Sequence, residues 1–188
     1  MKNNNSSWNL KPLTKVNFSK QRKVTEKVHQ AFINKWQKNN NWKSDPKTLK
    51  QTLDEYEKIQ YYYANGSSEG YYYSLLTSLN ESDSKIKALY GKAKDFIVKQ
   101  ANSILFFEQE LSKLPINKKI EFLSCDILND YKYFLERCFV RGKYLLSESE
   151  EKILNLKSGV SCNNWINMTS EFLSSASATI INEKNKKE

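Results

Sequence analysis

The 188-residue sequence contains little glycine and proline, with five and three residues respectively. Sandwiches and barrels need many turns that are rich in these residues, so their scarcity argues against an all-β fold and favours long helices. The sequence also lacks an apolar run of about 18–20 residues, the length needed to cross a bilayer. Its opening residues, MKNNNSS, have no apolar stretch behind them and therefore predict no signal peptide.

Histidine is scarce too, because His29 is the only one in the chain. A zinc peptidase of the helical His-Glu-x-x-His type needs two imidazoles one turn apart and a glutamate between them, so this sequence cannot form that site. His29 follows an amphipathic helical pattern, and we interpret it as a boundary residue rather than a ligand. A Gly-rich phosphate loop and a nucleophile elbow are also missing. We therefore predict no catalytic, cofactor-binding or metal-binding residue in this chain.

The three cysteines, Cys125, Cys138 and Cys162, have neither the close pairing of a zinc site nor the even number typical of a disulfide framework. We interpret them as reduced, small hydrophobic residues. This interpretation predicts a cytoplasmic protein.

The net charge of +9 is concentrated in the first third of the chain. Residues 1–60 contain 13 Lys and Arg against 5 Asp and Glu, whereas residues 61–188 contain 17 against 16. Only three of the 30 basic residues are arginine, the side chain that most often reads base edges. The basic excess predicts weak, non-specific attraction to nucleic acid at most, and no specific nucleic-acid partner.

Apolar residues recur at helical spacing along most of the chain, which predicts an all-α fold. The strongest pattern extends over residues 84–114, where apolar positions widen beyond a single stripe. We therefore predict an antiparallel helical bundle, or packed hairpins, around one long central helix. Further helices are expected over residues 19–39, from Pro46, over 71–79, from Pro115, over 127–140, from a capping box at Ser147 to Gly159, and around 165–173.

The expected domain organisation is simple. Residues 1–17 form an amino-terminal arm and residues 18–175 form one helical domain. Residues 176–188 form a polar tail that should fray, because they are small and polar and then rich in lysine.

Two runs of three tyrosines, residues 61–63 and 71–73, cannot both be buried completely. Three consecutive helical residues spread over about 200°, so some rings of each run must lie at a boundary. One interpretation is that these tyrosines bury the ring edge and keep the hydroxyl in water. The other is that outward rings, with Tyr62 and Tyr72 as the candidates, contact a partner or line a peptide cleft.

Several segments resemble the amino-terminal domain of oligoendopeptidase F-type enzymes, which are zinc metallopeptidases related to thimet oligopeptidase. Residues 8–13 (WNLKPL) resemble the family's W-D-L-x-x-L opening, and residues 105–115 resemble its long helix with a proline stop. Residues 131–137 (YKYFLER) and 144–154 (YLLSESEEKIL) are similar to its Y-x-x-x-L-E-R and H-x-L-S-E-E-E-E-K-I-L stretch, with Tyr144 near the place where a histidine is frequent. Trp165 also falls where the family has a tryptophan.

The resemblance implies a cytoplasmic, zinc-dependent enzyme that hydrolyses short oligopeptides inside a deep channel. It places the zinc ligands and the catalytic glutamate in a carboxyl-terminal catalytic domain that this chain lacks. The implied partners are that domain and the oligopeptide substrate, with no membrane. The chain itself should be inactive and should supply the scaffold and one wall of the channel.

Two other functions stay open at this point: a stand-alone helical module that binds a peptide or a protein, and a weak basic nucleic-acid binder. If a catalytic body covers this domain, the chain should expose an apolar patch larger than the few hundred Å² usual for monomers. A uniformly polar surface would favour the independent module.

Overall fold

The computed structural model describes residues 9–63, 67–81 and 83–177, and within these ranges the chain forms helices and no strand. The predicted all-α class is therefore confirmed. The α-helices are α1 (Phe18–Trp36), α2 (Pro46–Tyr63), α3 (Ser67–Leu79), α4 (Ser84–Ser112), α5 (Ile116–Leu123), α6 (Lys132–Arg141), α7 (Glu148–Ser158) and α8 (Asn164–Ser175). Short 3-10 helices cover η1 (Lys11–Thr14), η2 (Asn41–Lys43) and η4 (Asp126–Tyr131), and η5 (Gly159–Asn163) is a π-helix that joins α7 to α8.

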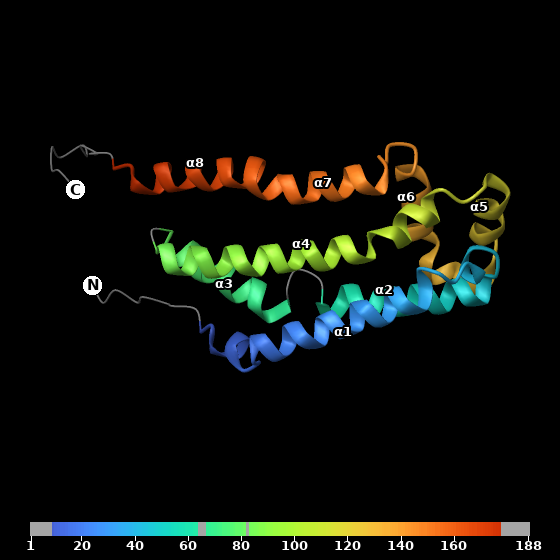
Figure 1. Ribbon diagram of the computed structural model, residues 1–188, viewed down its shortest axis with the longest axis horizontal. Helices are drawn as coiled ribbons and strands as arrows, with labels where there is room; N and C mark the ends of the chain where they lie inside the picture. Colours follow the sequence, from blue (N-terminus) through green and yellow to red (C-terminus); the bar gives the residue numbers. More distant parts are fainter. Residues whose placement is uncertain (1–8, 64–66, 82, 178–188) are drawn as a thin grey trace, which may run out of the picture.

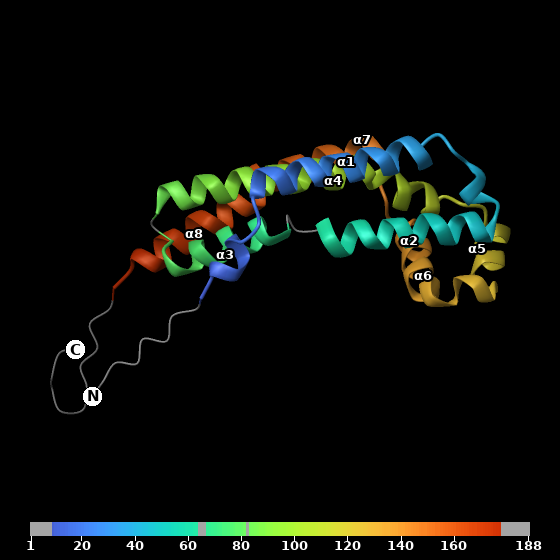
Figure 2. The same ribbon diagram turned by 90° about the horizontal axis from the view of Figure 1, so that it is seen from below.

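The molecule is elongated, and its helices run mostly along the long axis (Figure 1). Helix α4 extends along most of that axis and packs against α1, α3, α6 and α7. Helices α5 and α6 turn the chain at one end, and the α7–α8 segment then returns beside α4. Figure 2 shows α2 and α3 on one side of the α1–α4 pair.

Side-chain caps fix several helix starts. The Asn17 side chain accepts a hydrogen bond from the Lys20 amide at 2.9 Å and begins α1. At α4, the carboxylate of Asp83 accepts from two backbone amides of the first turn. Ser147 and Glu150 form the predicted capping box before α7, each side chain hydrogen bonded to the other's backbone amide.

Two predicted boundaries are wrong. The segment 127–140 is not one helix, because η4 takes up its beginning and places the Tyr131 hydroxyl 2.7 Å from Asp54 Oδ1. Gly159 does not end α7, because its φ of −60° and ψ of −52° are helical and the chain continues through η5 into α8. A glycine inside a helix costs about 1 kcal/mol relative to alanine, which disfavours the helix without stopping it.

The core lies at one end of the molecule. Phe107 on α4 is fully buried and contacts the rings of Phe32, Trp42 and Tyr56 at centroid distances of 4.9–5.7 Å. Helices α5 and α6 close this core with side chains such as Phe122 and Leu135, both fully buried. By contrast, α7, η5 and α8 contain no buried residue. The α7–α8 segment is therefore attached to the core domain along one side only.

A search of the helices within the described ranges found none with both the length and the apolar character required to cross a membrane.

Candidate functional site

The two tyrosines singled out from the sequence lie in different surroundings. Tyr72 is half-buried on α3, with its ring 5.8 Å from the ring of Phe18 and 5.3 Å from that of Tyr73. The side chain of Tyr62 lies outside the described residues. Tyr71 points outward more than Tyr72, with 56% of its surface exposed. A contact of Tyr62 and Tyr72 with peptide or partner stays a prediction.

His29 is buried and not at a boundary as predicted, with only 4% of its surface exposed. Its Nδ1 atom lies 2.9 Å from the carbonyl oxygen of Thr25, one turn earlier on α1. A carbonyl oxygen can only accept a hydrogen bond, so the Nδ1–H group of the neutral ring is the donor. The imidazole therefore has a backbone hydrogen-bond partner within the core. His29 is thus a structural residue.

Burial of this ring lowers the pKa of His29 below its ordinary value of 6.5. Above pH 6.5 the imidazole is neutral in both states, whereas at lower pH the unfolded chain binds a proton that the folded protein resists. We therefore expect the free energy of unfolding to decrease as the pH falls from 6.5 towards the folded-state pKa, by at most about 1.4 kcal/mol per pH unit. Urea denaturation at several pH values between 7.5 and 5.5 measures this slope.

The control is His29→Gln, which cannot titrate in this range. Since His29 is the only histidine, the variant should lose most of the pH dependence between 7 and 5.5. An equal slope in the variant would contradict the assignment.

The cysteines show no arrangement suited to catalysis or metal binding. Burial raises the pKa of the Cys138 thiol to about 12, so it remains protonated at neutral pH. Cys125 is half-buried and Cys162 is exposed, and all three are free. Within the ranges that the structure describes, no three His, Cys, Asp or Glu side chains come together in a way that could hold a metal ion.

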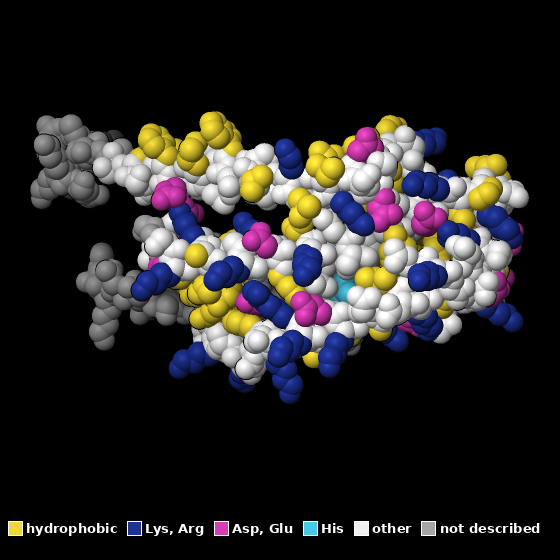
Figure 3. Space-filling model, in the orientation of Figure 1, with side chains coloured by type: hydrophobic (Ala, Val, Ile, Leu, Met, Phe, Trp, Pro, Cys, Tyr) yellow, Lys and Arg dark blue, Asp and Glu magenta, His cyan; other side chains and the backbone are white. Residues whose placement is uncertain are grey.

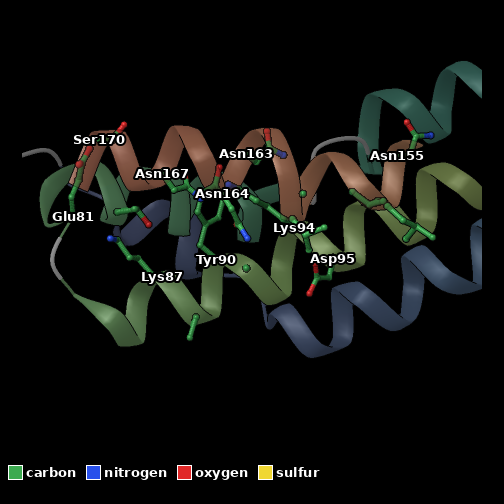
Figure 4. Close-up of a pocket in the computed structure, with 17 residues that line it drawn as sticks. Glu81, Lys87, Tyr90, Lys94, Asp95, Asn155, Asn163, Asn164, Asn167 and Ser170 are labelled. Carbon is green, nitrogen blue, oxygen red and sulfur yellow. The ribbon is translucent and has the colours of Figure 1, made fainter. Parts of the chain in front are cut away.

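A groove of about 610 Å³ lies between the amino-terminal half of α4 and the α7–α8 segment. Figure 3 shows it as an open slot beneath α8, and Figure 4 shows its lining, with α4 forming one wall and the α7–α8 segment the other. This volume lies within the range of about 300–1,000 Å³ that is typical of ligand sites.

The α7–α8 wall of this groove is rich in carboxamides. Asn155 comes from α7, Asn163 from η5, and Asn164, Asn167 and Ser170 from α8. The sequence reasoning missed these residues. The signal was present, because Asn163, Asn167 and Ser170 recur at helical spacing, but nothing in the sequence indicates that they face a groove.

The α4 wall presents a mixture of groups at helical spacing. Lys87 and Lys94 lie among apolar surface, and Lys94 Nζ stands 4.2 Å from the centroid of the Tyr90 ring. The two lysines are balanced by Glu81 and Asp95, so the groove carries no net formal charge.

Two contacts tie the walls together. Lys87 Nζ lies 2.6 Å from a carboxylate oxygen of Glu171 on α8. Further along, the amide of Asn155 donates to the side-chain oxygen of Asn102 on α4 at 2.8 Å. These contacts span the groove without filling it.

The opposite side of the α7–α8 segment is apolar and exposed. We call this surface the outer face; Figure 3 shows apolar side chains along this edge of the molecule. Each of its large hydrophobic side chains has more than half of its surface exposed: Ile153, Leu154, Trp165, Ile166, Met168, Phe172 and Leu173.

The apolar side of helix α8 therefore faces away from the rest of the described chain. Trp165 and Phe172 are seven residues apart, so they share one side of the helix, and they are 68% and 73% exposed. Asn167 and Ser170 lie on the other side, towards α4. A helix normally buries its apolar side against the core, whereas the described residues leave this side of α8 exposed.

The match to known proteins falls on this same segment. Residues 110–177 match the family model of the amino-terminal domain of M3 peptidases, which is described as Oligopeptidase F. The matched residues run from the last turn of α4 through α5, α6 and α7 to the end of α8. No curated protein and no solved structure matches the chain. Residues 110–177 are thus an oligoendopeptidase F-like amino-terminal segment, as the sequence resemblance implied.

Proposed function

We propose that this chain is a non-catalytic part of an oligoendopeptidase F-like zinc metallopeptidase that cleaves short oligopeptides. In this proposal the chain provides scaffold and one wall of the substrate channel, and its outer face packs against the catalytic domain. The observation that carries the proposal is the position of the outer face, which lies within the residues that match the peptidase family.

The residues of this chain do not fit the zinc ion that such a peptidase uses. The single histidine, His29, is buried, and its Nδ1 is engaged by the Thr25 carbonyl. The metal, the water that it activates and the general base must therefore come from the catalytic domain. This chain can form part of the channel wall, because a stiff layer of helices excludes folded proteins and lets unfolded peptides enter.

The physical case for a covering domain rests on the cost of exposed apolar surface. Burial of such surface yields roughly 25 cal/mol per Å², and large contiguous apolar patches on soluble proteins mark interaction sites. The groups of the outer face are aromatic and long aliphatic side chains, with Trp165 among them. Tryptophan is the residue type most enriched where binding energy concentrates.

The stand-alone interaction module is the second candidate, because an apolar partner of any origin would also satisfy the outer face. A nucleic-acid role has less support, since the basic excess is formed mainly by lysines of the first 60 residues. Phosphate contacts would make binding fall steeply as salt rises. Negligible binding at physiological salt would remove this last candidate.

The proposal predicts a catalytic polypeptide with a His-Glu-x-x-His motif, which binds this chain through the outer face. We expect the double substitution Trp165→Ser and Phe172→Ser to weaken that binding at least about 100-fold, because two aromatic anchors contribute about 2 kcal/mol each. Calorimetric titration of the two purified polypeptides measures the affinity. A fluorogenic oligopeptide should be cleaved only when the catalytic polypeptide is present with zinc.

Tyr133→Ser is the matched control, because this ring is 74% exposed on α6 and lies outside the outer face. It should leave the affinity within about twofold of the unchanged chain, since exposed rings outside an interface contribute little. Chelator-sensitive cleavage by the chain alone would overturn the proposal. Binding that the double substitution does not affect would favour the independent module.

A further inference from the structure

We infer that the groove between α4 and α8 is a binding site for the main chain of an extended peptide. This inference extends the proposed function: it gives the chain a direct role in holding substrate rather than only limiting access to it.

The carboxamides of the α7–α8 wall match a peptide group in chemistry. An asparagine side chain has two N–H donors and one C=O acceptor, so it can pair with both the carbonyl and the amide of an extended chain. Asn163, Asn164 and Asn167 place three such groups along one wall, whereas the amide of Asn155 already donates to Asn102. These three asparagines are exposed, so their donors and acceptors are accessible to a ligand.

The opposite wall supplies apolar contact for side chains of the peptide. Tyr90, Ala88 and Val98 provide this surface on α4, and Leu156 and Val160 extend it on the other helix segment. Ligand sites commonly combine an apolar lining with a few polar groups that fix orientation.

The charges of the groove favour a neutral ligand segment. The lining contains two lysines, Lys87 and Lys94, and two carboxylates, and Glu171 outside the lining also pairs with Lys87, so there is no excess of positive charge. A phosphate or a run of acidic side chains would find no unbalanced positive charge. The repeating peptide group is uncharged and requires none.

The length of the groove sets the length of the bound segment. Asn155 and Ser170 are 15 residues apart on a nearly continuous helix, which corresponds to about 22 Å at 1.5 Å per residue. An extended chain rises about 3.3–3.6 Å per residue, so about six residues fit. The groove therefore suits a hexapeptide-sized stretch of unfolded chain.

The test uses the full chain and a fluorescein-labelled hexapeptide of mixed neutral sequence, blocked at both ends, with binding measured by fluorescence anisotropy. A second peptide has the same sequence but carries N-methyl groups on alternate amides, which removes main-chain donors. We expect the N-methylated peptide to bind at least about tenfold more weakly, since each lost hydrogen bond contributes about 0.5–1.5 kcal/mol. Equal affinity for the two peptides, or no binding of either, would overturn the inference.

The variant Asn164→Leu with Asn167→Leu keeps side-chain size and removes two carboxamides; it should weaken binding of the unmodified peptide by about tenfold or more. The matched control is Asn117→Leu, an exposed asparagine on α5 that should leave affinity unchanged. Unchanged affinity in the double variant would assign the peptide to another surface.

An experiment on the outer face separates failure of the groove inference from failure of the proposed function. The pair Trp165→Ser and Phe172→Ser changes the outer face and should leave hexapeptide binding intact. If that pair instead abolishes peptide binding, the peptide occupies the outer face and the groove assignment is wrong. Loss of the catalytic partner's binding in the same variant would still support the proposed function.

Discussion

Replacement of Phe107 by alanine should lower the free energy of unfolding by about 3–5 kcal/mol, the range for a fully buried phenylalanine. Its ring contacts three other aromatic rings, those of Phe32, Trp42 and Tyr56, which come from three different segments. The cavity left by the substitution would be surrounded by large, rigid rings that cannot collapse into it easily. Urea denaturation followed by circular dichroism at 222 nm gives the difference.

Phe172→Ala is the matched control, because this phenylalanine is 73% exposed on α8. It should change the free energy of unfolding by less than about 0.5 kcal/mol, as is usual for surface positions. A cost similar to that of Phe107→Ala would mean that the outer face is buried in the isolated chain, for instance by self-association.

Gly142→Ala is expected to destabilise the protein by about 1–3 kcal/mol, although it adds a single methyl group. A Cβ atom at Gly142 would lie 2.8 Å from Ser112 Cβ and 2.9 Å from the Ser112 carbonyl oxygen. Ser112 is buried at the end of α4, so the ends of α4 and α6 would have to separate. Thermal and urea unfolding of the variant measure the loss.

Gly91→Ala tests whether close packing, rather than the loss of a glycine, is the cause. Apart from its chain neighbours and the nearby backbone of its own helix, no described atom lies within 4 Å of a Cβ at Gly91, which is within α4. Alanine favours a helix over glycine by up to about 1 kcal/mol, so this variant should be slightly more stable. Destabilisation by both substitutions would exclude the proposed steric explanation.

Much of the fold could be predicted because its signals are local. The carboxylate of Asp83 and the Ser147–Glu150 box each act within one turn of backbone, and both caps are present. The central position of α4 followed from an apolar stripe too wide for one neighbour. The continuation of the helical segment through Gly159 could not be predicted, because a glycine lowers helix stability but does not by itself determine whether the helix ends.

The site depends on tertiary information that the pattern does not contain. The periodicity of Trp165 and Phe172 indicates an apolar side of a helix, but periodicity cannot say whether that side faces the core or the solvent. The same holds for Asn167, which borders the groove only because α8 lies beside α4. The consecutive tyrosines predict rings at a boundary, and the half-buried ring of Tyr72 lies 5.8 Å from that of Phe18.

Helix α8 forms a single layer between the groove and the outer face. If the proposed catalytic domain docks on one side, it would fix the position of the wall on the other side, so that both proposed binding events would involve the same helix. Thermodynamic linkage then requires reciprocity. If docking on the outer face raises the affinity for a peptide by some factor, the bound peptide must raise the affinity for docking by the same factor. In an assembled peptidase, a bound substrate peptide would therefore change the affinity with which the catalytic domain docks around it.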